Sequence, residues 1–252
     1  MKRSGVWCRA VLFGAVLLSC GAHADETPAG TLSGSITVAS DYLFRGISQT
    51  DRRPAAQLGV EYDRASGWYL GGWASNVSWL SDTSTSTQPV SNSLEFDAYA
   101  GWRGQFDADW RWDAGLYAYT YPGSYPHGYT RPQTVEGYVW LGWKTLTLKV
   151  FRSFTNLFGT ADSHGSDYLE LSWHQPLSPD WMLEAHVGRQ QVAHHGSASY
   201  DDWKLGVTRT FGQGWSLALE WHDTDARRAV YTNAQGKYLG RATAVLSVAK
   251  AF

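Results

Sequence analysis

Apolar and polar residues alternate along most of this chain. In the stretch "GSITVASDYLFRGISQT" (34–50), every second residue from Gly34 to Phe44 is mostly apolar, and the residues between them, from Ser35 to Arg45, are mostly polar. Such a period of two predicts a β-strand with two unlike faces. In a soluble sandwich the apolar face would be the core, whereas in a membrane barrel it would contact lipid and the polar face would line a lumen.

Similar alternation recurs in segments of about ten residues, the length that a tilted strand needs to cross a membrane. The pattern predicts about twelve strands, at 32–46, 55–64, 68–78, 93–104, 110–121, 133–143, 145–155, 166–175, 181–190, 201–211, 214–223 and 239–252. Apolar outward faces are expected, for example, at Leu94, Phe96, Ala98, Ala100, Trp102; Val135, Gly137, Val139, Leu141, Trp143; Trp203, Leu205, Val207; and Trp215, Leu217, Leu219, Trp221.

The predicted connections alternate between long and short. "LSDTSTSTQPVSN" and "DTDARRAVYTNAQGKY" are long, whereas "RASG" and "GQG" are short. Transmembrane barrels have short periplasmic turns and longer external loops, while Greek-key sandwiches have no reason to alternate. We therefore expect an all-β fold: an antiparallel, up-and-down transmembrane β-barrel. A soluble sandwich rich in tryptophan is the alternative.

Residues 1–24 have the features of a secretory signal peptide. Lys2 and Arg3 precede the short apolar run "VLFGAVLLS", and "AHA" at 22–24 supplies an A-x-A cleavage site. Residues 25–252 would then form a single barrel domain. Both cysteines, Cys8 and Cys20, lie in the removed segment, although "LLSC" also resembles a lipoprotein box at Cys20.

Composition and charge narrow the classes of protein further. The chain contains 14 Trp, 14 Tyr and 26 Gly, which suits a barrel with aromatic girdles but also a carbohydrate-binding sandwich. Loss of the three basic residues of the signal peptide changes the formal net charge from −2 to −5, so nucleic acid is not an expected partner.

Aromatic residues flank the predicted short turns and the end of the chain. One periplasmic girdle is expected from Trp68, Trp102, Trp110, Trp143, Trp181, Phe211 and Trp215. Phe252 ends an alternating last strand, as in the signal by which outer-membrane barrels are recognised for assembly. Lys250 and Arg152 depart from the pattern because they fall on the apolar face, but a lysine near an interface costs only ~0–1 kcal/mol.

The stretch "DYLFRGISQT" resembles the TorF family of proteobacterial outer-membrane porins. "SGWYLGGWASNVSW", "LEFDAYAGW" and the terminal Phe252 extend this similarity over the mature chain. The resemblance implies an outer-membrane barrel with a transport function, exported in a Gram-negative bacterium, and it carries over no catalytic residues.

The polar faces predict which side chains line the lumen. They are Asp41, Arg45, Glu61, Glu95, Asp97, Arg103, Arg111, Asp113, Glu136, Lys149, Glu170, Glu184, Lys204, Glu220 and Arg241. The acidic excess would favour cations in a narrow channel. If positions 32 and 251 meet where the barrel closes, Asp41 would contact Arg241, and Arg45 would need an acid of the second strand such as Glu61.

The predicted function is therefore a porin for small polar solutes, not an enzyme and without a cofactor. Its expected partners are outer-membrane lipid, periplasmic chaperones and the barrel-assembly machinery. Two alternatives stay open: a barrel enzyme, for which His222 with Asp223 and Asp225 is the one suggestive cluster, and a plugged barrel that binds through its loops. His164, His194 and His195 lack the spacing of metal ligands, so no metal is expected.

Overall fold

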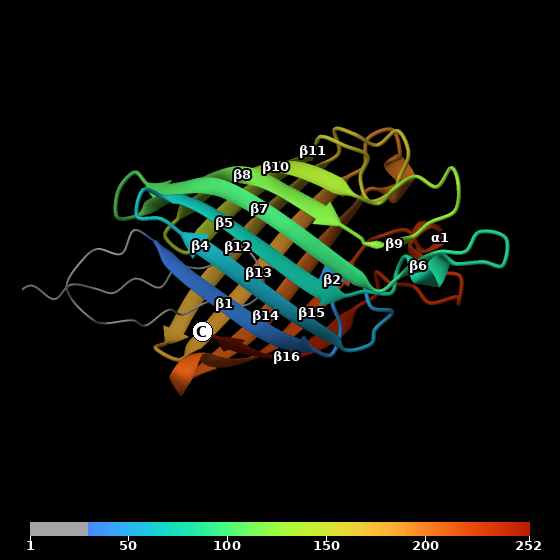
Figure 1. Cartoon of the computed structure of the whole chain (residues 1–252). Coiled ribbons are helices and arrows are strands. Elements are labelled where there is room, and N and C mark those ends of the chain that lie inside the picture. The colour runs from blue at the N-terminus through green and yellow to red at the C-terminus, as the bar shows by residue number, and fades with distance from the viewer. Residues whose placement is uncertain (1–29) are drawn as a thin grey trace, which may run out of the picture.

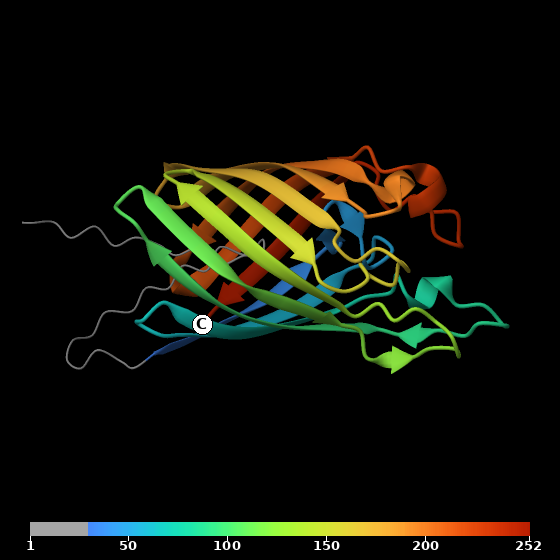
Figure 2. The same ribbon diagram turned by 90° about the horizontal axis from the view of Figure 1, so that it is seen from above.

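A closed β-barrel of twelve antiparallel strands makes up the computed structural model, which describes residues 30–252 (Figures 1 and 2). Each strand pairs with its neighbours along the chain, and β1 closes the barrel against β16. The wall is formed by β1 (Thr31–Ala39), β4 (Ala55–Asp63), β5 (Trp68–Asn76), β7 (Leu94–Gln105), β8 (Trp110–Thr120), β10 (Thr134–Trp143), β11 (Leu146–Ser153), β12 (Asp167–Ser178), β13 (Trp181–Gln191), β14 (Tyr200–Phe211), β15 (Trp215–Thr224) and β16 (Thr243–Ala251). The predicted fold and strand number are confirmed.

The connections alternate in length as the sequence predicts. Short turns lie at 64–67, 106–109, 144–145, 179–180 and 212–214, and the longer connections gather at the opposite end of the barrel. The long connections carry the short elements β2 (Leu43–Phe44), β3 (Ile47–Ser48), β6 (Ser91–Asn92), β9 (Gly123–Ser124), η1 (Ser81–Thr83), η2 (Gly196–Ala198) and α1 (Arg228–Tyr231); η3 (Gly212–Gly214) is a short turn. Within residues 30–252, no helix has the length and apolar character needed to cross a membrane.

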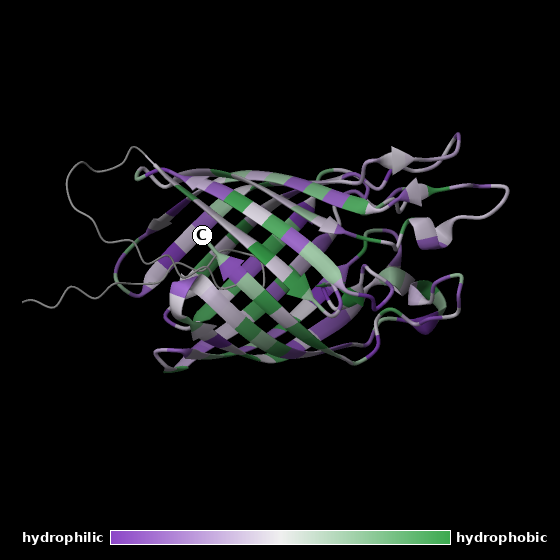
Figure 3. Cartoon of the chain, turned by 60° about the horizontal axis from the view of Figure 1, so that its bottom comes forward, coloured by the Kyte–Doolittle hydropathy of each residue, from purple (hydrophilic) through white to green (hydrophobic). Residues whose placement is uncertain are grey.

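The outer surface of the wall is apolar. Ile36, Val139 and Leu205 are at least half exposed, and every wall strand has at least one exposed apolar side chain on its outward face. Apolar and polar residues alternate along the strands (Figure 3). Because a closed barrel satisfies every backbone hydrogen bond within its wall, this surface can lie in a lipid bilayer.

The first strand differs from the prediction of a strand over 32–46. β1 ends at Ala39, and residues 40–54, here called the inner segment, turn into the barrel before β4 begins. Tyr42 and Phe44, predicted to face lipid, instead pack inside against Trp73 and Tyr119 at ring-centroid distances of 5.3 and 5.6 Å. The alternation of apolar and polar residues continues past Ala39. Because the backbone turns inward there, the apolar residues that follow lie inside the barrel and do not face lipid.

The barrel closes in a different register from the predicted one. Ser35 pairs with Ala251, and the backbones of Gly34 and Phe252 exchange hydrogen bonds of 2.9 and 3.0 Å. Leu32 therefore does not meet position 251. A closing barrel needs a stagger between its first and last strands, and this stagger leaves the first residues of β1 paired with β4 only.

Candidate functional site: the barrel interior

The inner segment, which joins β1 to β4, extends into the interior and is fixed to β10 and β13. The Arg45 guanidinium donates to both carboxylate oxygens of Glu136 on β10, at 3.1 and 2.6 Å, and to Gln190 on β13 at 2.7 Å. Both members of the Arg45–Glu136 ion pair are buried. A bidentate pair of this kind fixes orientation as well as charge, so Arg45 holds the segment across the lumen.

A tight turn at the tip of the segment makes this contact possible. Arg45 has a φ of +48° and Gly46 a φ of +76°, so two consecutive residues are left-handed. A Cβ at Gly46 would collide with the side chain of Thr224 and lie 3.0 Å from Cβ of Asp202. Glycine is therefore required where the segment lies against β14 and β15.

The two contacts predicted for Asp41 and Arg45 are wrong. Asp41 accepts hydrogen bonds from the hydroxyls of Ser48 and Thr50, at 2.7 and 2.9 Å, within the inner segment. Burial raises the pKa of Asp41, and these hydrogen bonds act in the opposite direction. The prediction assumed that β1 continues straight through Arg45, whereas the inward turn moves both side chains.

Arg241 lies outside the lumen, contrary to the prediction. It is exposed in the connection before β16, and within residues 30–252 it forms no ion pair with Asp41. Glu61, the acid predicted for Arg45, instead accepts from Arg103 at 2.5 Å, and Arg103 also pairs with Asp63 at 3.1 Å.

Ion pairs between wall strands cross-link the rest of the interior. Lys149 pairs with Glu170 at 2.7 Å, and Lys204 bridges Glu220 and Glu184 at 2.7 and 3.5 Å. Each pair joins strands that are hydrogen-bonded neighbours. Arg111, also predicted for the lumen, is half-buried near a short turn and donates to the Lys144 carbonyl.

Two of the predicted acids are enclosed by tyrosines instead of cations. Glu95 accepts from the hydroxyl of Tyr121 at 2.9 Å, and Asp97 accepts from that of Tyr117 at 3.0 Å. Their exposed fractions are 1% and 0%, and within residues 30–252 neither forms an ion pair. Since they do not line the central cavity, they are not placed to contact a solute within it.

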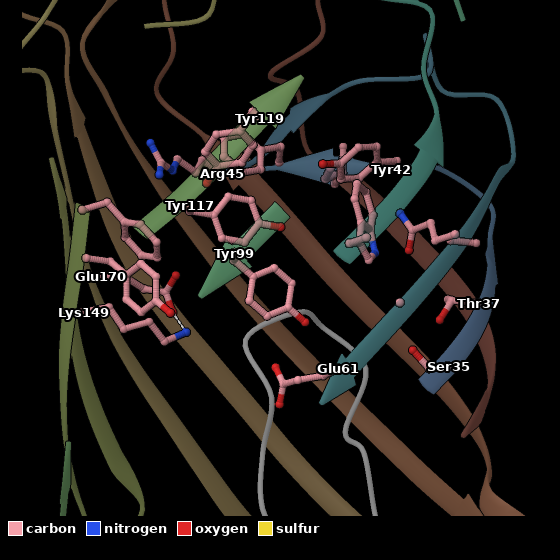
Figure 4. A pocket seen from close by; sticks show the side chains of 18 of the residues that line it. Ser35, Thr37, Tyr42, Arg45, Glu61, Tyr99, Tyr117, Tyr119, Lys149 and Glu170 are labelled. Atoms are coloured by element: carbon pink, nitrogen blue, oxygen red, sulfur yellow. Dashed lines mark hydrogen bonds and ion pairs between the residues drawn. The ribbon is translucent and has the colours of Figure 1, made fainter. Parts of the chain in front are cut away.

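A cavity of about 270 Å³ lies in the barrel, bounded in part by residues 41–45 of the inner segment. One side, here called the aromatic arc, is lined by Tyr69, Trp73, Tyr99, Tyr117, Tyr119, Tyr138, Trp140, Phe151 and Tyr168. Another part, here called the polar arc, is lined by Ser33, Ser35, Thr37, Gln57, His222 and Ser247. In Figure 4, Tyr99 and Tyr117 lie across the cavity from Ser35 and Thr37.

The sequence prediction missed the aromatic arc, although the signal was present. Tyr99 follows Asp97 by two residues and Tyr138 follows Glu136 by two, so these tyrosines share the polar face. Inside the barrel they form a packed series: Tyr99 and Tyr117 stack at 5.3 Å with an interplanar angle of 3°, and Tyr117 lies 4.5 Å from Tyr119. The arc is therefore a rigid surface.

The residues predicted for the girdle and for the end of the chain lie near the short turns. Trp102, Trp110, Trp143, Trp181, Phe211 and Trp215 are exposed and Trp68 is half-buried, all at strand ends beside short turns. Phe252 is 66% exposed. Lys250 reaches the backbone carbonyl of Gln213 in a short turn, and Arg152 pairs on the outer surface with Asp167 at 3.0 Å. Both cations thus have polar partners near a barrel rim.

Two of the loop histidines contact backbone oxygens. His194 and His195 lie 2.9 and 2.8 Å from the carbonyls of Asp162 and Ala161. Within the described residues 30–252, no group of three or more His, Cys, Asp or Glu side chains could hold a metal ion.

The closed twelve-stranded wall, apolar outside and charged inside, defines a porin-like β-barrel. The chain belongs to the family described as "Bacterial protein of unknown function (Gcw_chp)", whose sequence profile matches residues 23–252. No curated protein sequence matches the chain. The similarity to TorF porins stays a prediction, as does the signal peptide, which lies outside the described residues.

Solved porins share this fold at low sequence identity. The KdgM porin is 9% identical with a TM-score of 0.56, and the match covers 87% of this chain and 99% of the porin. The NanC porin is 11% identical with a TM-score of 0.52, covering 88% and 99%. A structure of the KdgM porin in complex with disordered oligogalacturonate is 9% identical with a TM-score of 0.54, covering 88% and 98%. These similarities establish the fold.

Proposed function

We propose that this protein is a channel of the bacterial outer membrane that passes small polar solutes, and that it is not an enzyme. The observation that carries the proposal is the contrast across one closed wall. Leucine, valine and tryptophan side chains cover its outer surface, while ion pairs such as Lys149–Glu170 lie inside. An apolar exterior suits lipid, and a charged, cross-linked interior suits water and polar solutes.

The lumen is narrow and mildly acidic in this proposal. Five acidic side chains line the central cavity, against three Lys or Arg side chains. The inner segment reduces the cross-section of the barrel at the end that carries the long connections. In a narrow pore with low-dielectric walls, an excess of one charge strengthens the preference for ions of the opposite sign. Because the excess here is acidic, we expect a cation-selective pore.

The same proposal places the chain in its membrane. Export by the predicted signal peptide would deliver it to the periplasm, where Phe252 would be recognised during assembly. Chaperones and the barrel-assembly machinery would be its partners there. The tryptophans beside the short turns would then lie at the periplasmic interface.

Planar-bilayer recording of the purified protein tests this function. We expect discrete conductance steps with reversal potentials that indicate cation preference. Asp113 lines the cavity and accepts from the Tyr69 hydroxyl at 2.5 Å, so Asp113→Asn should reduce the cation-to-anion ratio by about twofold. Glu95→Gln is the matched control and should leave this ratio unchanged.

Folded protein that gives no conductance steps would contradict the channel proposal. A heat-dependent shift on gel electrophoresis separates folded from unfolded barrel, so a failure to fold is not mistaken for a closed pore. Equal effects of Asp113→Asn and Glu95→Gln would contradict the assignment of the charged lining.

A further inference from the structure

We infer that the central cavity is a binding site for a neutral saccharide of one or two rings. The inference rests on the proposed channel function and names a solute class for it. A cavity of about 270 Å³ is close to the lower end of the ~300–1,000 Å³ range of ligand sites. It therefore suits a compact solute more than an extended chain.

The aromatic arc supplies the first half of the recognition. The C–H groups of a sugar ring form an apolar, weakly positive surface that is attracted to the negative face of an aromatic ring. Tyr99, Tyr117 and Tyr119 hold one another at centroid distances of 4.5 to 5.3 Å, so their orientation is fixed before any solute arrives. A rigid aromatic surface loses little conformational entropy on binding.

The polar arc supplies the second half. The hydroxyls of Ser35 and Thr37 and the amide of Gln57 line the cavity from β1 and β4. Each can donate or accept, as the hydroxyls of a sugar can. A ring stacked on the aromatic arc would therefore present its edge to hydrogen-bonding groups across the cavity (Figure 4).

The charges of the lining argue against an acidic saccharide. Its three basic side chains already have acidic partners: Arg45 pairs with Glu136 at 2.6 Å, Arg103 with Glu61 at 2.5 Å and Lys149 with Glu170 at 2.7 Å. A carboxylated sugar would have to break one of these pairs and would meet Asp113 nearby. A neutral sugar meets no such cost.

Binding can be measured on the full chain extracted in detergent, by the change in intrinsic tryptophan fluorescence, because Trp73 and Trp140 line the cavity. Maltose and glucose are the neutral probes, and digalacturonate is the acidic probe. We expect saturable binding of a neutral probe, at least about tenfold tighter than that of digalacturonate. Equal or tighter binding of digalacturonate, or no saturable binding of either neutral probe, would overturn the inference.

Variants connect the binding to the two arcs. Tyr99→Leu should weaken maltose binding by about tenfold and Thr37→Val by about fivefold. Tyr129→Leu, in a long connection outside the cavity lining, is the matched control. If Tyr129→Leu weakens binding as much as Tyr99→Leu does, the site is not this cavity.

A variant that fills the cavity tests the location of the site with a substitution that the fold should tolerate. A Cβ at Gly59 would meet Ser35 Oγ and Trp73 Cδ1 at 3.5 Å each, which is ordinary contact, so a larger side chain can begin there without collision. Gly59→Leu should fold and bind no maltose. Maltose binding by folded Gly59→Leu at unchanged affinity would contradict the proposed location.

The channel and the binding site can fail separately. Ion conductance without sugar binding would support the channel proposal and contradict this inference. Saturable maltose binding by a protein that passes no ions would support the binding site and contradict the channel proposal. When both hold, maltose should reduce the ion current with the same concentration dependence as the fluorescence change.

Discussion

Two long connections at the same end of the barrel take opposite paths. The inner segment (40–54) turns into the lumen, whereas the connection at 77–93, here called the outer loop, extends away from the wall (Figure 1). Tyr42 and Arg45 of the inner segment are 8% and 9% exposed, while residues 83–89 of the outer loop are all exposed.

The difference between them follows from the partners that their side chains find. The inner segment has two aromatic residues, Tyr42 and Phe44, and one of its three arginines, Arg45, is buried. The wall that they contact supplies Glu136, Tyr119 and other tyrosines. The exposed part of the outer loop, "TSTSTQP", has only small polar side chains and proline and gains little from burial. A few residues that form buried contacts with the wall therefore determine whether a polar connection lies inside the barrel or extends into solvent.

Removal of the main anchor should have the largest effect. Arg45→Ala leaves the Glu136 carboxylate buried without its cation, a change that costs ~3–5 kcal/mol in comparable buried pairs. We expect the inner segment to leave the lumen and the single-channel conductance to rise roughly threefold, since ion flow depends on the open cross-section. Single-channel recording measures this change.

Two controls sharpen the Arg45 experiment. Arg45→Lys keeps the charge but cannot make the bidentate contact, so its conductance should lie between those of the wild type and Arg45→Ala. Arg53 lies in the same segment with its side chain 59% exposed and ion pairs of 3.7 and 4.0 Å. A rise in Arg53→Ala equal to that in Arg45→Ala would show that Arg45 is not the anchor.

A pair of glycine variants tests the backbone of the segment. Gly46 and Gly128 have φ values of +76° and +79°, so valine is strained at both by ~1–2 kcal/mol. At Gly46 the side chain would also collide with Thr224, while nothing lies within 4 Å of a Cβ at Gly128. Conductance should rise in Gly46→Val and stay unchanged in Gly128→Val. Similar values in both variants would mean that the fit against β14 and β15 does not hold the segment.

The fold could be predicted because it depends on a periodic pattern. Alternation over Leu94 to Trp102 or Trp215 to Trp221 is repeated in every wall strand, so local errors do not change the number of strands. The register at closure was not predictable to the residue. Shifting β1 by a few positions against β16 leaves similar small and apolar side chains facing lipid, and the stagger depends on the whole barrel.

The interior could be predicted only in part. The alternation of apolar and polar residues identified Glu136, Lys149 and Glu170 as inward residues. It does not reveal which strands lie opposite each other across the lumen. The Arg45–Glu136 pair joins residues 91 positions apart, and it exists because the chain turns inward after Ala39. Strand alternation has no signal for such a turn, since Tyr42 and Phe44 fit a lipid-facing pattern equally well.

The link between the inner segment and the last long connection should have a smaller effect. Lys237 donates to Asp51 at 2.6 Å and is about half exposed, a setting in which ion pairs contribute ~0.2–1 kcal/mol. Lys237→Gln should increase current noise while changing the mean conductance by less than about 1.5-fold. The difference from wild type should become smaller in 1 M salt, where the Debye length falls to ~3 Å and half-exposed ion pairs contribute less. A difference that stays unchanged in 1 M salt would point to a packing effect.

Shortening the outer loop should have the smallest effect of all. Residues 84–89 are exposed, and the contacts that join this loop to the inner segment lie before them, where Ser78 and Trp79 donate their backbone N–H groups to the Gln49 carbonyl at 2.9 and 3.2 Å. Replacement of residues 84–89 by Gly-Gly keeps these contacts and changes the free energy of loop closure by only ~0.2 kcal/mol. Conductance and thermal stability should match those of the wild type. A conductance as high as that of Arg45→Ala would mean that the outer loop, and not the Arg45 anchor, keeps the inner segment in the lumen.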